Sequence, residues 1–157
     1  SLLASHLLGR TKKWNASNIN AGCWAASALN KSLNTRLYNA MPTQIRELMK
    51  KVIVHSSVGN MSSELSSSDC YITIPALIEV DSTQTNEPYN SEGKAISYLV
   101  TNTSRKRAFD NGDYATYWLR SPNVGYANYI WRVDENGAVQ GITNATGNLG
   151  VLIEISF

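Results

Sequence analysis

The amino-acid sequence predicts a single α+β domain spanning residues 1–157, and three observations support this. The chain length suits one domain that buries a core without metal ions or disulfide bonds. A hydrophobic fraction of 43% and a charged fraction of 17% are typical of a globular protein. Helical patterns come first along the chain and strand patterns come last, which predicts two N-terminal helices followed by a small antiparallel sheet with a C-terminal hairpin.

The two helices are predicted from apolar periodicity. The first covers residues 20–34, an Ala-rich segment that we expect to end at Asn34. Its apolar residues recur at helical spacing: Trp24, Ala28, Leu29 and Leu33. The second begins at Met41-Pro42-Thr43, because proline is favoured in a first turn. Its expected apolar face consists of Ile45, Leu48 and Met49.

Short strands are predicted after the helices. Residues 52–54 and 71–74 are rich in β-branched residues, and Pro75 ends the second run. Between them, residues 56–68 are rich in Ser, Gly and Asn, which predicts a loop. A helical turn over 76–80 and a polar loop over 81–91 follow.

A hairpin is predicted near the C-terminus. Residues 129–133 alternate with a period of two, and Asn136-Gly137 is a strong turn signal before a return strand over 138–140. Residues 141–150 are small and polar and predict a turn-rich segment. Residues 151–155 predict a closing strand.

Charge and hydropathy exclude several partner classes. A net charge of +2 is too small to indicate nucleic-acid binding, and the basic cluster at residues 104–107 is interpreted as a solvated loop, with a phosphate contact as the alternative. No stretch reaches the roughly 18 apolar residues of a membrane span, so no membrane insertion is expected. The apolar residues 1–8 are interpreted as the continuation of a preceding segment, so we expect this chain to be the C-terminal part of a longer protein.

No catalytic, cofactor or metal motif is present in the sequence. His6 and His55 lack partners at motif spacing, and there is no nucleophile elbow, phosphate-binding loop or zinc pattern. Cys23 and Cys70 are expected as two buried free thiols, with a single disulfide bond as the alternative. The sequence therefore predicts a protein that is not an enzyme and that needs no cofactor.

Residues 123–148 combine Tyr and Trp with Asn, Thr and Gly, the composition of an antibody paratope. Large aromatic rings supply rigid contact area, and small polar residues supply adaptable hydrogen bonds. The alternative is an ordinary polar hairpin with some core aromatic residues. Since charge is low throughout, contacts are expected to be neutral hydrogen bonds rather than ion pairs.

The run Trp118-Leu119-Arg120-Ser121-Pro122 resembles the motif of a family of domains from gut bacteria and their phages. Further matches keep the same order along the chain: the Trp-containing segment 24–34, Met41-Pro42, residues 72–80, an arginine at 105 or 107, residues 133–137 and residues 150–155. The resemblance covers nearly the whole chain, and it implies a C-type-lectin-like fold.

Many such domains are variable proteins of diversity-generating retroelements, so the resemblance implies a diversified ligand-binding surface between framework positions. The framework positions would be Ser121, Pro122, Ala127, Ile130, Val133, Gly137, Ala145, Gly150 and Val151. The expected ligand-binding residues, on one contiguous exposed face, are Asn123, Val124, Tyr126, Asn128, Tyr129, Trp131, Gln140, Ile142, Asn144, Thr146 and Asn148. Trp131 departs from this pattern, because its codon cannot arise from the diversified asparagine codons.

The resemblance also implies a receptor-binding role in a phage tail or on a bacterial surface, with a host-surface protein or glycan as ligand. It leaves open a homotrimer or a monomer for the full-length protein. Glu87-Pro88-Tyr89 and Trp131-Arg132-Val133 differ from the calcium-binding motifs of lectins, so no calcium site is expected. Two alternatives remain: a structural domain without a ligand, or an enzyme related to formylglycine-generating oxidoreductases.

The residues that support this surface are expected inside the protein. Trp24, Leu29, Leu48 and Trp118 are predicted to pack in the core. Arg120 is predicted to form a buried ion pair or to bond backbone carbonyls rather than to touch a ligand.

Overall fold

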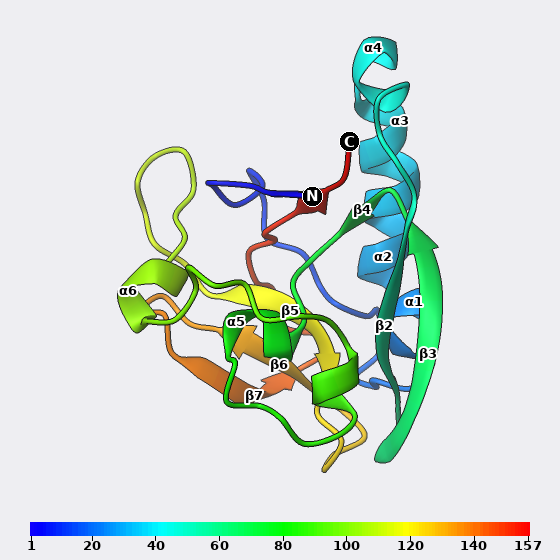
Figure 1. Ribbon diagram of the computed structural model, residues 1–157, viewed down its shortest axis with the longest axis vertical. Coiled ribbons are helices and arrows are strands. Elements are labelled where there is room, and N and C mark those ends of the chain that lie inside the picture. The colour runs from blue at the N-terminus through cyan, green and yellow to red at the C-terminus, as the bar shows by residue number, and fades with distance from the viewer.

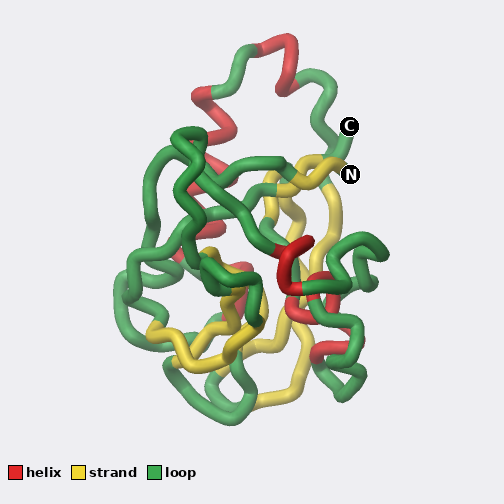
Figure 2. The backbone as a smooth tube through the Cα atoms, turned by 90° about the vertical axis from the view of Figure 1, so that its left-hand side faces the viewer, coloured by secondary structure: helices red, strands yellow, loops and turns green.

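A computed structural model describes all residues, 1–157, and shows a mixed α+β fold with short helices and small antiparallel sheets (Figure 1). Loops and turns make up much of the chain (Figure 2). The helices are α1 Cys23–Ala26, α2 Ala28–Ser32, the π-helix η1 Leu33–Leu37, α3 Tyr38–Ala40, α4 Thr43–Arg46, α5 Leu77–Val80, the 3-10 helix η2 Tyr89–Ser91 and α6 Asn102–Arg105. None of them has the length and apolar character that crossing a membrane requires.

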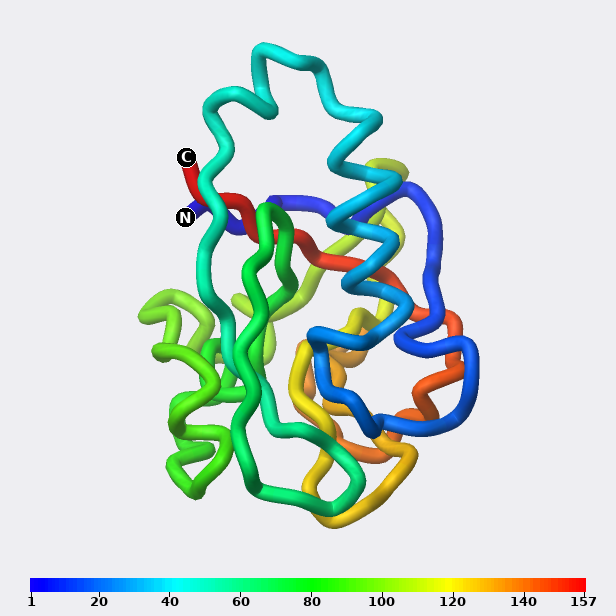
Figure 3. The backbone as a smooth tube through the Cα atoms, turned by 90° about the vertical axis from the view of Figure 1, so that its right-hand side faces the viewer, coloured from blue at the N-terminus to red at the C-terminus, as the bar shows by residue number.

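The strands form three separate sheets. They are β1 Leu2–Leu3, β2 Val52–Gly59, β3 Ser62–Cys70, β4 Ile72–Thr73, β5 Tyr117–Pro122, β6 Tyr129–Val133, β7 Val139–Asn144 and β8 Glu154–Ile155. The sheet orders are β1-β8-β4, β2-β3 and β5-β6-β7, and neighbouring strands in each sheet are antiparallel. Since β1 pairs with β8, the two ends of the chain lie side by side (Figures 1 and 3).

Strand β5 separates two hydrophobic clusters, because its successive side chains point to opposite faces. Trp118 belongs to a cluster with Trp14, Trp24 and the helical run. Tyr117 and Leu119 belong to a second cluster beneath α5 and the loop that follows it. All of β5 is buried, so this strand is the centre of the fold.

The first helix is longer than the sequence prediction. Helical structure runs from Cys23 to Ala40, with one break at Ser27, and Asn34 does not end it. The Asn34 side chain instead donates to the carbonyl of Ile72 at 2.8 Å and accepts from the Tyr71 amide at 2.8 Å. A residue that favours helix ends thus lies within the helix, because its side chain holds the start of β4.

The second helix is shorter than predicted. Only α4 is helical, and Leu48 and Ile45 are 62% and 40% exposed while Met49 is buried. The prediction that Leu48 packs in the core is wrong. The reason is position: α4 lies at the far end of the molecule beyond the sheets, where no element covers its apolar face (Figure 1).

The predicted loop over residues 56–68 is wrong, because this segment forms most of the β2-β3 hairpin. Its turn uses Asn60 and Met61, both with positive φ, as a two-residue hairpin loop requires. Ser56 and Ser57 are buried: the Ser56 hydroxyl accepts from the Trp24 amide, and the Ser57 backbone amide donates to the Glu92 carboxylate. Serine composition alone therefore did not reveal a strand whose polar groups are satisfied by other segments.

The C-terminal hairpin is confirmed. β6 covers the predicted residues 129–133, and Gly137 in the turn has a φ of 82°. β7 continues to Asn144, beyond the predicted strand, while the closing strand is reduced to β8. In this strand order β7 is an edge strand, and it carries Gln140, Ile142 and Asn144 of the predicted ligand-binding residues.

Candidate functional site

Arg120 fixes the centre of the framework beneath the candidate site. Its side chain is 2% exposed and donates to the carbonyls of His55 at 3.0 Å and Ile74 at 2.8 Å, and to that of Glu92. It also pairs with the Glu79 carboxylate at 3.0 Å. The prediction of a buried ion pair with backbone contacts is confirmed. One guanidinium thus ties β2, β4, α5 and the segment after η2 to β5.

Glu92 lies in the same buried cluster. It is 1% exposed, its Oε2 accepts from the Ser57 amide at 3.1 Å, and its Oε1 has no partner. Burial raises the pKa of the Glu92 carboxyl to about 7, and the nearby Glu79 acts in the same direction. Because burial disfavours the charged form, the neutral form of this carboxyl persists to a higher pH than that of an exposed glutamate.

Asn20 fixes the loop between β5 and β6. It is fully buried, and its Nδ2 donates to the carbonyls of Tyr126 at 2.8 Å and Tyr129 at 2.9 Å. Its Oδ1 accepts from the Asn60 amide at 2.7 Å, in the turn of the β2-β3 hairpin. Three segments that are far apart in sequence therefore meet at one side chain, at the lower end of the molecule in Figure 3.

Substituting Asn20→Ala is expected to lower the free energy of unfolding by about 2 kcal/mol, because buried backbone groups lose their partners. Urea unfolding measures this, and hydrogen exchange at residues 123–129 should become faster than in the wild type. The control Asn39→Ala removes an exposed asparagine and should change stability by less than about 0.5 kcal/mol. Equal stability of Asn20→Ala and the wild type would contradict this role.

Four of the predicted ligand-binding residues lie together above Asn20. The rings of Tyr126 and Tyr129 are 4.8 Å apart, and Tyr126 is 48% exposed. Tyr129 is the direct cross-strand partner of Asn144. The Oδ1 of Asn144 accepts from Nδ2 of Asn128 at 3.2 Å and from Nδ2 of Asn18 at 3.3 Å. We call Tyr126, Asn128, Tyr129, Asn144 and Asn18 the tyrosine–asparagine patch.

Two other predicted residues, Val124 and Trp131, contact Tyr89 instead, and Asn123 lies next to them in the chain. The Tyr89 hydroxyl accepts from the Trp131 indole at 3.1 Å and from the Val124 amide at 3.0 Å, and the two rings meet edge to face. The Nδ2 of Asn123 donates to the Gly141 carbonyl at 2.7 Å. Asn123, Val124 and Trp131 are half-buried, so they connect the patch to the second cluster more than they offer free surface.

The remaining predicted residues lie along β7 and after it. Gln140 accepts from the Arg132 guanidinium at 2.6 Å, and Ile142 is 63% exposed on the edge strand. Thr146 is half-buried and Asn148 exposed in the segment that follows β7. The eleven residues are therefore spread over a patch, a packed aromatic contact and a strand edge rather than over one flat face.

Burial separates the expected framework residues from the expected variable ones. Of the nine framework positions eight are buried, and Ala127 is half-buried. Of the eleven ligand-binding positions none is buried. Substitutions at the second group are thus expected to disturb the core little, except at Val124 and Trp131, which pack against the second cluster.

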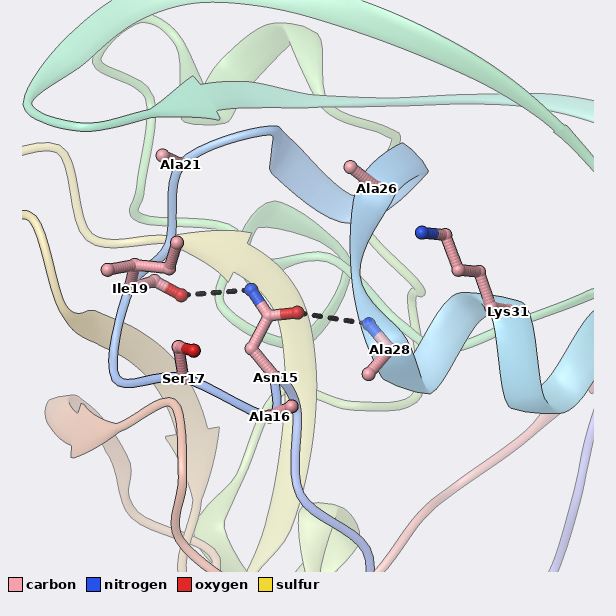
Figure 4. A pocket seen from close by; sticks show the side chains of 8 residues that line it. All are labelled: Asn15, Ala16, Ser17, Ile19, Ala21, Ala26, Ala28 and Lys31. Carbon is pink, nitrogen blue, oxygen red and sulfur yellow. Dashed lines mark hydrogen bonds between the residues drawn. The ribbon is translucent and has the colours of Figure 1, made fainter.

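The segment that carries Asn18 and Asn20 also lines an open depression of about 280 Å³. Asn15 holds its shape by donating to the Ile19 carbonyl at 2.9 Å and accepting from the Ala28 amide at 3.0 Å (Figure 4). The wall is mostly small apolar side chains with Lys31 at one side. Such a surface offers apolar contact area beside the polar groups of Ser17 and Lys31.

The thiols of Cys23 and Cys70 are free and buried, as predicted, and they are 4% and 1% exposed. A formylglycine-type reaction needs thiols in an open groove, which these positions do not provide. Asn18, Asn20 and Tyr89 were missed by the sequence reasoning. Each contributes through contacts to residues far away in sequence, so no local pattern could have revealed it.

A family model described as "Domain of unknown function (DUF6273)" matches residues 1–152 of the chain. No curated protein and no solved structure matches it.

Proposed function

The chain belongs to the DUF6273 family, and we propose that it is a ligand-binding domain with a C-type-lectin-like fold. It recognises a molecule on a host surface through the tyrosine–asparagine patch and the edge of β7. In this proposal the domain is part of a phage tail or of a bacterial cell surface. The mixed α+β arrangement with its late antiparallel sheet is compatible with this fold.

The observation that carries the proposal is the separation between framework and surface. Eight expected framework residues are buried, whereas Tyr126, Tyr129 and Asn144 are accessible and adjacent. A rigid support beneath accessible aromatic and amide groups is the arrangement of an antibody paratope. In this proposal the exposed positions vary between related domains while the buried ones are kept.

The test is binding of the labelled domain to gut-bacterial cells, measured by flow cytometry. The double variant Tyr126→Ala/Tyr129→Thr should lose at least about tenfold in bound signal, since aromatic residues dominate interface energies. Threonine is chosen because it retains strand propensity in β6.

The matched control is Tyr98→Ala/Tyr114→Ala, which removes two exposed tyrosines outside the patch, 58% and 56% exposed. Both double variants should unfold near the wild-type temperature. Binding that both variants retain, or lose equally, would favour a structural domain without a ligand on this surface.

A further inference from the structure

Four chain segments around the patch carry no formal charge. Residues 14–30, 56–63, 121–131 and 136–153 contain no Asp, Glu, Lys, Arg or His, although the chain as a whole has 14 basic and 12 acidic residues. These segments include both sides of the hydrogen bonds made by Asn20, so they are brought together in space. Charged residues next to them, the buried Glu92 and Lys31 at one side of the depression, come from other parts of the chain.

Exposed apolar side chains accompany the patch. Ile19 is 49% exposed and Met61 is 63% exposed, and each is adjacent in sequence to a residue of the Asn20 hydrogen-bond network. Tyr126 contributes its ring from the third segment. In Figure 3 the β2-β3 turn and the β5–β6 loop lie at the same end of the molecule.

Two amide groups of the patch have unused hydrogen-bonding capacity. Asn144 accepts twice through Oδ1, and its Nδ2 has no partner. Asn128 donates through Nδ2, and its Oδ1 has no partner. A free donor and a free acceptor therefore stand on two amides that are joined by one hydrogen bond of 3.2 Å, next to the Tyr126–Tyr129 ring pair.

We propose that this end binds an uncharged glycan, with a sugar ring packed on Tyr126 and Tyr129 and neighbouring hydroxyls bonded to Asn128 and Asn144. This inference rests on the proposed function, because it names the ligand of the same surface. A hydroxyl both donates and accepts, so adjacent sugar hydroxyls match a donor and an acceptor that lie side by side. Carbon–hydrogen faces of the sugar match the aromatic rings.

Other ligand classes fit this surface less well. Sialylated, sulfated or uronate-containing glycans and nucleic acids carry anionic groups, which are bound by Arg or Lys. None of these residues is present in the four segments. Affinity for an uncharged glycan should consequently change little between low and high salt.

The first measurement is calorimetric titration with uncharged polysaccharides (dextran, mannan and galactan) and with heparin and polygalacturonate as charged counterparts. Binding is expected to at least one uncharged probe, with the same affinity in 50 and 500 mM salt (about 14 and 4 Å Debye length). Binding to the charged probes alone would overturn the proposal.

The variant Asn144→Ala removes the free donor and should weaken binding at least about tenfold, because a hydroxyl bonded there loses its partner. Asn136→Ala removes an exposed asparagine at the hairpin turn and should bind like the wild type. Equal binding by both variants, each with an unfolding temperature near that of the wild type, would overturn the assignment of Asn144.

Cell binding separates this inference from the proposed function. Periodate oxidation breaks the carbon–carbon bond between adjacent hydroxyl-bearing carbons of surface sugars and should abolish binding, whereas proteinase treatment should leave it intact. If binding depends on Tyr126 and Tyr129 but survives periodate and is lost after proteinase, the ligand is a protein and only the glycan assignment fails. If no cell binding depends on these tyrosines, the proposed function fails as well.

Discussion

Replacement of Arg120 by alanine is expected to lower the free energy of unfolding by about 3–5 kcal/mol, because it leaves a buried carboxylate without its partner. The guanidinium pairs with Glu79 at 3.0 Å and bonds three backbone carbonyls from separate segments. All of these groups would remain buried, and none could turn to solvent without moving β2 or α5. A loss of this size removes much of the stability of a typical domain.

Urea unfolding of Arg120→Ala beside the wild type measures this effect. Arg120→Lys should also be strongly destabilised, since an ammonium cannot satisfy four acceptors in one plane. The control Arg36→Ala, at an exposed position of η1, should change stability by less than about 0.5 kcal/mol. Wild-type stability for Arg120→Ala would show that the buried ion pair does not support the fold.

Glu92→Gln is expected to stabilise the protein above pH 7 and to flatten its pH dependence between about 4.5 and 7. The folded-state pKa of Glu92 is raised to about 7 by burial, from 4.5. In that interval the folded protein holds a proton that the unfolded chain has released. The contribution of Glu92 to stability is therefore fully present below pH 4.5 and is lost as the pH rises through 7.

The raised pKa of Glu92 corresponds to a contribution of about 3 kcal/mol at most to the free energy of unfolding, because a shift of one pKa unit is worth about 1.4 kcal/mol. Urea unfolding at pH 4.5, 6 and 8 compares the wild type with Glu92→Gln, and the difference should grow with pH and then level off. Glu47→Gln neutralises an exposed carboxyl and should follow the wild-type curve. A constant difference between Glu92→Gln and the wild type across the three pH values would contradict protonated Glu92.

The sequence predicted the elements whose signals are local. The alternation of residues 129–133 and the Asn136-Gly137 turn specified the C-terminal hairpin, and Pro75 marked the end of the preceding strand. The burial of Trp24, Leu29 and Trp118 followed from their size and spacing.

Elements that depend on distant partners were mispredicted. Glu92 and Trp24 complete hydrogen bonds of the serine-rich β2-β3 hairpin. The sequence of residues 56–68 contains no signal of these distant partners. The helix continues past Asn34 because that side chain has partners on β4. Conversely, the apolar spacing at Leu48 predicted a core contact that no neighbouring element provides.

The candidate site was predicted in composition but not in shape. Tyr126, Tyr129 and Asn144 are adjacent because β6 pairs with β7, which the turn signal predicts. Asn18, by contrast, reaches Asn144 across more than a hundred residues of chain. The division between the patch and the Tyr89 contact depends on such long-range packing, and periodicity carries no information about it.

The pairing of β1 with β8 places both ends of the chain together, away from the candidate site. Leu2 lies opposite Ile155, while the loops tied by Asn20 lie at the lower end of Figures 1 and 3. Any tether joined to either end of the chain would transmit tension into that short terminal ladder. Because the loops held by Asn20 lie away from that ladder, a tether at either terminus would leave the patch facing away from the point of attachment.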